Sequence, residues 1–344
     1  MNSNHLKYKK IFDKFSKSTL IHEAVLLIEN SNGDFTYCQE YGNKKTDSPF
    51  LMASITKLFT TTCILILLEN EKLSLNDKIS KFLDDDKIKG LHIFNGQEYS
   101  YNLTISDLLF QVSGLPDVYE EGKNSIKNQL INEDHFLSFN EMMSFNKKLK
   151  PHFVPGTDKK AYYSDINFDI LGEIIQTTSN LPLHEVYKKF IFEPLNLVNT
   201  YLPENDMDFI PGVYYNDVVL YRPLFLKSSP ASGGCITTAV ELMKFVKAFF
   251  SGSLFNKNIF HMLSKYNKLQ LSMGPIYYGG GYMQIPLSGF YTMFMGKGEL
   301  LGHSGSTGSF AFYYPDKDLY FVGDVNQMSN PALPIRLVMQ LAMA

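Results

Sequence analysis

The stretch FLMASITKLFTTTCILILL, from Phe50 to Leu68, places a serine and a lysine three residues apart at the start of a long apolar run. Positions i and i+3 share one face of a helix, so a helix here brings the amine of Lys57 near the hydroxyl of Ser54. Burial disfavours an ammonium group and so favours a lysine that acts as a base. The pattern predicts a nucleophile with its base, or a helix start in which Ser54 is an N-cap and Lys57 extends to solvent.

A second pair with the same spacing, Ser144 and Lys147, occurs in the segment MMSFNKKLK. The neighbouring lysines indicate a solvated surface rather than a site. The serine–lysine spacing alone therefore identifies no active site. Other stretches of the sequence have to show whether Ser54 is a nucleophile.

Composition excludes several function classes. The 344 residues are 44% hydrophobic and 19% charged, with a formal net charge of −3, which is typical of a soluble globular protein. We expect no nucleic-acid partner, because there is no basic stripe, and no membrane span, because no apolar run is long enough. The start lacks the apolar region of a signal peptide, so we expect a cytoplasmic protein, or an extracytoplasmic one if an export signal has been removed.

The cysteines and histidines give no metal site. Cys38, Cys63 and Cys235 are widely separated, without CxxC spacing, and the eight histidines are scattered. This pattern argues against a disulfide framework and against zinc. We expect neither a metal nor a cofactor, and we expect Cys63 and Cys235 to be core residues.

Periodicity places strands at both ends of the chain. Residues 24–42 predict a hairpin that turns at Asn32-Gly33, and aromatic segments after Tyr277 predict three or four antiparallel strands. A closing helix is expected with Pro331 or Pro334 near its start. The other expected helices are 6–17, 57–71, 167–180 and 237–252.

This order predicts an α+β fold, in which an antiparallel sheet built from the N- and C-terminal segments is flanked by helices and carries an inserted, mostly helical domain. The whole chain, 1–344, is expected to form a single catalytic unit. Residues 1–55 plus about 255–344 would form a sheet subdomain, and about 56–254 a helical subdomain. A cleft between two such units is a usual place for a site.

Two further stretches carry polar chemistry. In HFVPGTDKKAYYSDINFDILGEII, Tyr163, Ser164 and Asp165 follow a Pro-Gly turn and precede a helix, where a phenol can relay a proton. In GHSGSTGSFAFYYP, residues 303–305 lie on an expected strand, with small residues where a ligand backbone can approach. The alternatives are that Tyr163 only packs and that 303–305 are a Gly/Ser-rich turn.

With these three stretches in order, the chain resembles the serine β-lactamase/penicillin-binding-protein superfamily on its class C side, which includes D-Ala-D-Ala carboxypeptidases, class C β-lactamases and esterases. Ser54-x-x-Lys57 matches the superfamily's nucleophile motif. Tyr163-Ser164-Asp165 stands in the place of Tyr-Ser-Asn, and His303-Ser304-Gly305 in the place of Lys-Thr-Gly. The resemblance spans about residue 20 to residue 330, including LTISDLLFQVSGLPD, and implies the β-lactamase/transpeptidase-like fold.

The resemblance also implies roles. Ser54 would be the acylated nucleophile, Lys57 would take its proton, and Tyr163 would protonate the leaving group. His303 would stand in the place of the basic residue and orient Tyr163 or a substrate carboxylate. The backbone N–H groups of Ser54 and Ser306 would form the oxyanion hole. The other expected substrate contacts are Asp165, Ser304, Gly305 and Gln111.

Three positions depart from the superfamily pattern. Asp165 replaces asparagine, His303 replaces lysine, and Gln111 replaces histidine before Ser-Gly-Leu-Pro. A carboxylate cannot donate a hydrogen bond to a substrate carbonyl, and near Lys57 it would stabilise the ammonium. We therefore expect a serine hydrolase that acts through an acyl-serine on a small ester, amide, peptide or β-lactam. The alternative is a penicillin- or peptidoglycan-binding protein with the same fold and little turnover.

Overall fold

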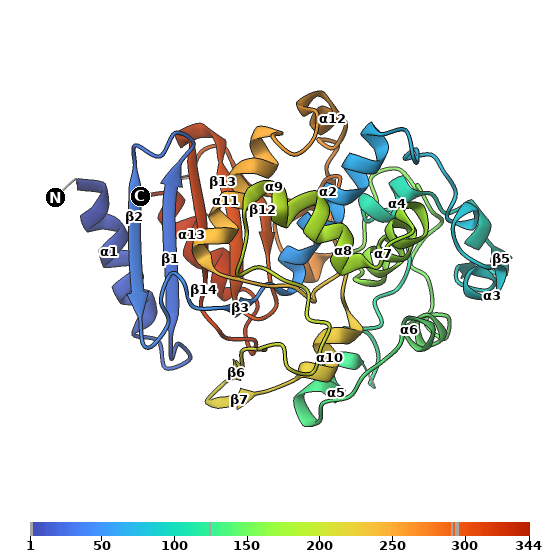
Figure 1. Ribbon diagram of the computed structural model, residues 1–344, viewed down its shortest axis with the longest axis horizontal. Helices are drawn as coiled ribbons and strands as arrows, with labels where there is room; N and C mark the ends of the chain where they lie inside the picture. Colours follow the sequence, from blue (N-terminus) through green and yellow to red (C-terminus); the bar gives the residue numbers. More distant parts are fainter. Residues whose placement is uncertain (1–2, 124, 290–291, 293–295) are drawn as a thin grey trace.

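The computed structural model describes residues 3–123, 125–289, 292 and 296–344 (Figure 1). Its central element is an eight-stranded sheet in the order β2-β1-β14-β13-β12-β11-β10-β9, with antiparallel pairing throughout. The strands are β1 (Ala24–Asn30), β2 (Thr36–Tyr41), β9 (Asn267–Lys268), β10 (Tyr277–Tyr278), β11 (Met283–Pro286), β12 (Glu299–Ser304), β13 (Ser309–Tyr314) and β14 (Leu319–Asp324). The sheet joins the two ends of the chain, as the sequence predicts.

The predicted hairpin is present as β1 and β2, and Gly33 in its turn has a φ of 80°, which glycine adopts without strain. β1 also pairs with β14, with Val25 opposite Asp324. Four strands of at least four residues follow position 280, in agreement with the predicted three or four. Residues 290–291 and 293–295, which the sequence assigns to the strand region, lie outside the described residues.

All six residues of β14 are buried. Successive side chains of a strand point to opposite faces, so both faces of the sheet are covered here. The terminal helices α1 (Ser3–Ser16) and α13 (Leu333–Ala342) pack against each other, and α13 contacts β12 and β13. Helix α11 (Ala239–Ser251) packs against β1, β13 and β14. Both chain ends lie on the sheet side of the molecule (Figure 1).

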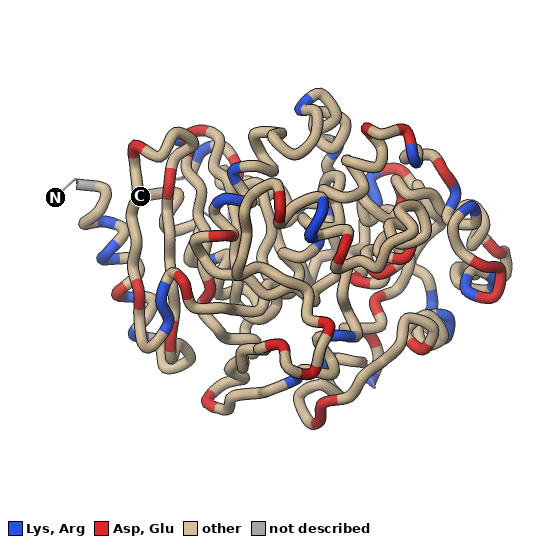
Figure 2. Tube along the Cα trace, viewed as in Figure 1, with Lys and Arg blue, Asp and Glu red and all other residues tan. Residues whose placement is uncertain are grey.

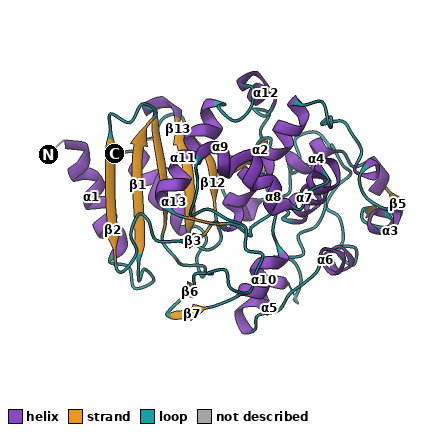
Figure 3. Ribbon diagram, viewed as in Figure 1, coloured by secondary structure: helices purple, strands orange, loops and turns teal. Residues whose placement is uncertain are grey.

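A mainly helical region lies beside the sheet (Figure 3). Its central helix, α2 (Thr56–Glu69), is buried over most of its length and contacts α7 (Ile166–Ser179) and α8 (Leu183–Tyr187). The other helices are α3 (Asp85–Ile88), α4 (Ile105–Leu109), α5 (Ile126–Asn132), α6 (Phe139–Asn146), α9 (Glu193–Leu195), α10 (Pro223–Ser228) and α12 (Lys257–Met262). The assignment of residues 56–254 to a separate subdomain stays a prediction.

Three small two-stranded sheets complete the fold. They are β3 (Phe50–Leu51) with β8 (Ile236–Thr237), β4 (Ile93–Phe94) with β5 (Gln97–Glu98), and β6 (Val213–Tyr215) with β7 (Val218–Leu220). The first of these is important for the site, because β3 leads directly into the turn that carries Ser54.

Acidic and basic residues are interspersed along the trace (Figure 2). Within the described ranges, no helix has both the length and the apolar character that crossing a bilayer requires. The cysteines are free thiols, and Cys63 and Cys235 are buried, as the sequence predicts.

Candidate active site

Ser54 lies on a tight turn, a 3-10 helix (Ala53–Ile55) between β3 and α2. Ala53 has a φ of 45°, a left-handed conformation that costs a non-glycine residue about 1–3 kcal/mol and is common at functional sites. The turn is held by its neighbours, since the N–H of Met52 donates to the carbonyl of Cys235 at 2.9 Å. Ile55 is the N-cap of α2, without a side-chain cap, so the interpretation of Ser54 as a helix cap is wrong.

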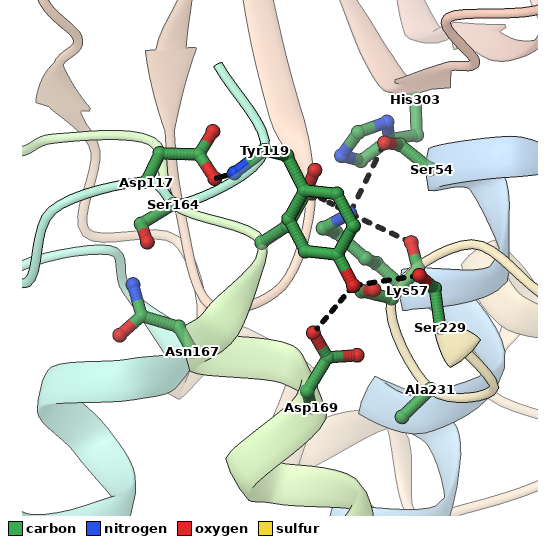
Figure 4. Close-up of polar contacts among 12 residues, drawn as sticks. Ser54, Lys57, Asp117, Tyr119, Ser164, Asn167, Asp169, Ser229, Ala231 and His303 are labelled. Carbon is green, nitrogen blue, oxygen red and sulfur yellow. Dashed lines mark hydrogen bonds and ion pairs between the residues drawn. The ribbon is translucent and has the colours of Figure 1, made fainter. Parts of the chain in front are cut away.

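Lys57 is fully buried in the first turn of α2, three residues after Ser54. Its Nζ donates to Ser54 Oγ at 3.1 Å and to the carbonyl of Ser232 at 2.7 Å, and it lies 2.5 Å from Asp165 Oδ1 (Figure 4). Three acceptors match the three donors of an ammonium group. The interpretation in which Lys57 extends to solvent is therefore wrong.

Tyr163 lies over this amine, with its ring centroid 5.2 Å from Lys57 Nζ. Burial, followed by the charge of Asp165, raises the pKa of Tyr163 well above its usual value, although a hydrogen bond with Ser54 lowers it. The phenol is therefore protonated at neutral pH. Its hydrogen bond with Ser54 places the phenol beside the proposed nucleophile, and its expected role as a proton donor stays a prediction.

His303 on β12 is fully buried and does not line the cavity, in contrast to the expected contact with a substrate carboxylate. Its Nδ1 faces the carbonyl of Ser304 at 2.8 Å and therefore carries the proton, and its Nε2 lies 3.4 Å from the hydroxyl of Tyr278. Burial, and then the charge of Lys57, lowers the pKa of His303 to about 3. Burial thus keeps the imidazole neutral. Its ring centroid lies 6.0 Å from that of Tyr163, so the expected role in orienting Tyr163 stays a prediction.

The segment after β12 passes close to the Ser54 turn. A Cβ on Gly305 would lie 2.5 Å from the carbonyl oxygen of Met52, so only glycine fits there. Ser309 Oγ donates to the same carbonyl at 2.8 Å. In the described part of the chain, the backbone N–H of Ser306 has no hydrogen-bond acceptor, so it is free to bind an oxyanion.

Gln111 is fully buried and does not line the cavity, so the expected substrate contact is wrong. Its Oε1 accepts hydrogen bonds from the N–H of Ser164 and the amide of Asn167, and its Nε2 donates to the carbonyl of Ser164. A buried amide that both donates and accepts hydrogen bonds in this way has a structural role. Gln111 fixes the loop that carries Tyr163 and Asp165.

Two carboxyl groups next to Lys57 are missing from the sequence prediction. Asp169 is buried, accepts a hydrogen bond from the hydroxyl of Tyr119, and has its pKa raised to about 7 by burial (Figure 4). Asp117 is also buried. Asp169 could have been predicted, because it lies four residues after Asp165 and so on the same helical face. No feature of the neighbouring sequence indicates Asp117.

Six of the expected residues line a cavity of about 600 Å³, whereas His303 and Gln111 do not. It is lined by Ser54, Tyr163, Asp165 and residues 304–306, with Lys57 buried beneath Ser54. The second serine–lysine pair lies elsewhere, since Ser144 is exposed and Lys147 donates to the carbonyl of Asp86. The cavity can hold a small acyl compound with its carbonyl near Ser54 Oγ.

Comparison with known proteins agrees with this geometry. The profile of the Beta-lactamase family matches residues 24–341. The chain belongs to the Beta-lactamase family. Membership confirms the superfamily that the three motifs indicate, as well as the β-lactamase/transpeptidase-like fold, and it identifies a hydrolase of this superfamily at the coarse level.

Two curated relatives each match a little more than half of the chain. Protein flp of Staphylococcus aureus (strain NCTC 8325 / PS 47) is 32% identical over 190 residues, which are 52% of this chain and 34% of flp. A putative D-alanyl-D-alanine carboxypeptidase of Salmonella agona (strain SL483) is 28% identical over 210 residues, 58% of this chain and 41% of the relative. The matched region thus spans about a third to two fifths of these proteins.

Solved structures share the fold over nearly the whole chain. A D-stereospecific amidohydrolase from Streptomyces sp. has a TM-score of 0.78 and 20% identity, with 98% of each chain covered. At this identity the similarity shows the fold alone.

Proposed function

We propose that the protein is a serine hydrolase that cleaves a small ester or amide through an acyl-serine on Ser54. The observation that carries this proposal is the hydrogen bond from Lys57 Nζ to Ser54 Oγ, 3.1 Å long, at a residue that lines a cavity. A serine and a fully buried lysine in contact form the nucleophile–base pair that covalent catalysis requires.

In the proposed reaction, Ser54 Oγ attacks the substrate carbonyl while its proton passes to Lys57. Asp165 lies 2.5 Å from Lys57 Nζ, so its charge would stabilise the ammonium that this step forms. Tyr163 then protonates the leaving group, which matches its protonated phenol. Water releases the acyl group in a second step, with the same groups acting in reverse.

The oxyanion of the tetrahedral intermediate would be held by the backbone N–H groups of Ser54 and Ser306. Both residues line the cavity, and Gly305 brings the two segments together. One such donor contributes about 3 kcal/mol of transition-state stabilisation.

The neutral His303 favours substrates other than those anchored by a carboxylate. A carboxylate needs a cation or several donors, whereas a neutral buried imidazole outside the cavity offers neither. A putative carboxypeptidase is among the relatives, but a substrate without a free carboxylate agrees better with the neutral His303.

A binding protein with little turnover is the second candidate, and the ion pair of Lys57 with Asp165 favours it. A lysine held as an ammonium is a poor base, so acylation or deacylation would be slow. Such a protein would keep a stable adduct on Ser54 after reaction with a penicillin.

Intact-mass spectrometry after incubation with a fluorophosphonate or a fluorescent penicillin tests the proposal, together with turnover of p-nitrophenyl acetate. We expect one adduct on the wild type and none on Ser54→Ala, with ester turnover in the wild type alone. A stable penicillin adduct without ester turnover would favour the binding protein, and no adduct from either reagent would exclude both candidates.

A further inference from the structure

Four carboxylates line the cavity that holds Ser54. Two of them pair with a lysine, and a third lies beside an imidazole. Asp165 pairs with Lys57, Glu120 pairs with Lys127 at 2.9 Å, and Glu121 lies 3.0 Å from the imidazole of His152. The fourth, Asp117, has no basic group within ion-pair distance among the residues that the structure describes.

Asp117 is 2% exposed. One carboxylate oxygen accepts the N–H of Tyr119 at 3.1 Å, and in the described ranges the other oxygen has no donor. Figure 4 shows the side chain on the loop that precedes Tyr119, beside Ser164. A buried carboxylate without a partner is costly, and so burial favours the protonated acid of Asp117 in the free protein. A cation bound in the cavity would stabilise the ionised carboxylate and pair with it.

The cations at the cavity do not fill this place. Lys57 already has three acceptors. Arg222 donates to the carbonyls of Leu130, Ile131 and Tyr221, so its guanidinium is held by backbone. With His303 neutral, the charge around the reacting atoms favours a positively charged ligand over a carboxylate.

Asp117 also lies close to the reacting groups. Burial, and then the charge of Asp165, raises the pKa of Asp117 well above its usual value, and the charge of Lys57 opposes this. The charge of Asp117 in turn adds to the rise in the pKa of Tyr163. A cation that contacts Asp117 is therefore near the scissile carbonyl, as the α-amino group is in an amino acid ester or amide.

We propose that Asp117 binds the protonated amine of the substrate, so that the protein acts on esters or amides of compounds with a free amino group, such as amino acid amides. The inference rests on the proposed hydrolase. An ammonium donates a charge-assisted hydrogen bond to the free oxygen of Asp117, and N-acylation of the amine removes both the charge and that bond.

The test compares alanine p-nitroanilide, in each enantiomer, with its N-acetyl form. We expect the free amine to have at least about tenfold higher kcat/KM for one enantiomer, because a hydrogen bond to a charged group has this strength. In Asp117→Asn, which keeps an acceptor for the N–H of Tyr119, this ratio should fall at least about tenfold. Glu120→Gln is the matched control, since its carboxylate is already paired, and it should keep the ratio.

Calorimetry with alaninamide needs no turnover and separates the two proposals. The wild type should bind alaninamide at least about tenfold more tightly than N-acetylalaninamide, and Asp117→Asn should lose the difference. If the wild type binds alaninamide with the expected preference but does not hydrolyse p-nitrophenyl acetate, only the proposed hydrolase is overturned. Turnover of p-nitrophenyl acetate with no preference for the amine in either measurement would overturn only the amine site. A preference that persists in Asp117→Asn would assign the amine to another residue and overturn the inference.

Discussion

Lys57 Nζ lies closer to Asp165 Oδ1, at 2.5 Å, than to the hydroxyl of Ser54, at 3.1 Å. The proposed base is therefore paired with an anion at the start of α7. An asparagine at this position would remove this counter-ion. The single change from amide to carboxylate thus places a negative charge beside the proposed base.

Replacing Asp165 by Asn should speed acylation. The variant removes the charge that stabilises the ammonium of Lys57 and adds an amide that can donate to a substrate carbonyl. We expect the second-order rate constant for p-nitrophenyl acetate at pH 7 to rise at least about threefold. Asp165→Ala is the control that removes the charge without adding a donor. A tenfold fall in both variants would mean that the carboxylate takes part in proton transfer.

Gly305→Ala should lower activity more than stability. The new methyl group would collide with the carbonyl of Met52 and push the backbone at Ser306 away from Ser54. Loss of one oxyanion donor corresponds to a fall of about a hundredfold in kcat/KM for the ester. Gly33→Ala is the comparison, because it strains a turn far from the cavity and should leave kcat/KM unchanged. Equal activity in the two variants would contradict the proposed oxyanion hole.

Gln111→Asn should destabilise the protein. Asparagine tolerates the left-handed backbone at this position, where φ is 58°, but it is too short to brace the loop. The N–H of Ser164 and the amide of Asn167 then lose their acceptor in a buried place, at a cost of about 2–3 kcal/mol. Urea denaturation measures this loss. A loss below about 0.5 kcal/mol would show that the loop does not depend on Gln111.

The stability effect of Asp169→Asn should depend on pH. Burial raises the pKa of Asp169 from 3.8 to about 7, so the unfolded chain releases this proton at lower pH than the folded protein. The contribution of Asp169 to stability is present below pH 3.8 and is lost as pH rises to 7. The wild type should therefore lose about 1.4 kcal/mol per pH unit relative to Asp169→Asn between pH 5 and 7.

Denaturation of both proteins in urea at pH 5, 6 and 7 measures this difference. Parallel stability curves would show that Asp169 has the same pKa in the folded and unfolded states.

The elements with strong local signals were predictable. The apolar run after Ser54 gives a helix, Asn32-Gly33 gives a hairpin turn, and Gly252 ends α11 in the left-handed conformation. The i, i+3 spacing of Ser54 and Lys57 likewise needs only a helix to bring the two side chains together. These features depend on residues that are close in the sequence, and so the sequence alone predicts them.

The roles of His303 and Gln111 were not predictable in the same way. From the sequence we expect His303 to orient Tyr163 or a substrate carboxylate, and we expect Gln111, which precedes Ser-Gly-Leu-Pro, to contact the substrate. Both residues are buried by elements distant in the sequence. Burial keeps the imidazole of His303 neutral, and it directs the amide of Gln111 to the backbone of Ser164. Asp117 was missed for the same reason, since its lack of a cation is visible only when all its neighbours are placed.

The sequence by itself determined the family, the antiparallel sheet built from both ends of the chain, and the pairing of a serine with a lysine on one helix. The tertiary structure decided the charges around that pair: the anion of Asp165 on Lys57, the neutral His303 and the unpaired Asp117. Hydrophobic periodicity and helical spacing are local properties of a chain, whereas the charge state of a buried group depends on every element that packs against it.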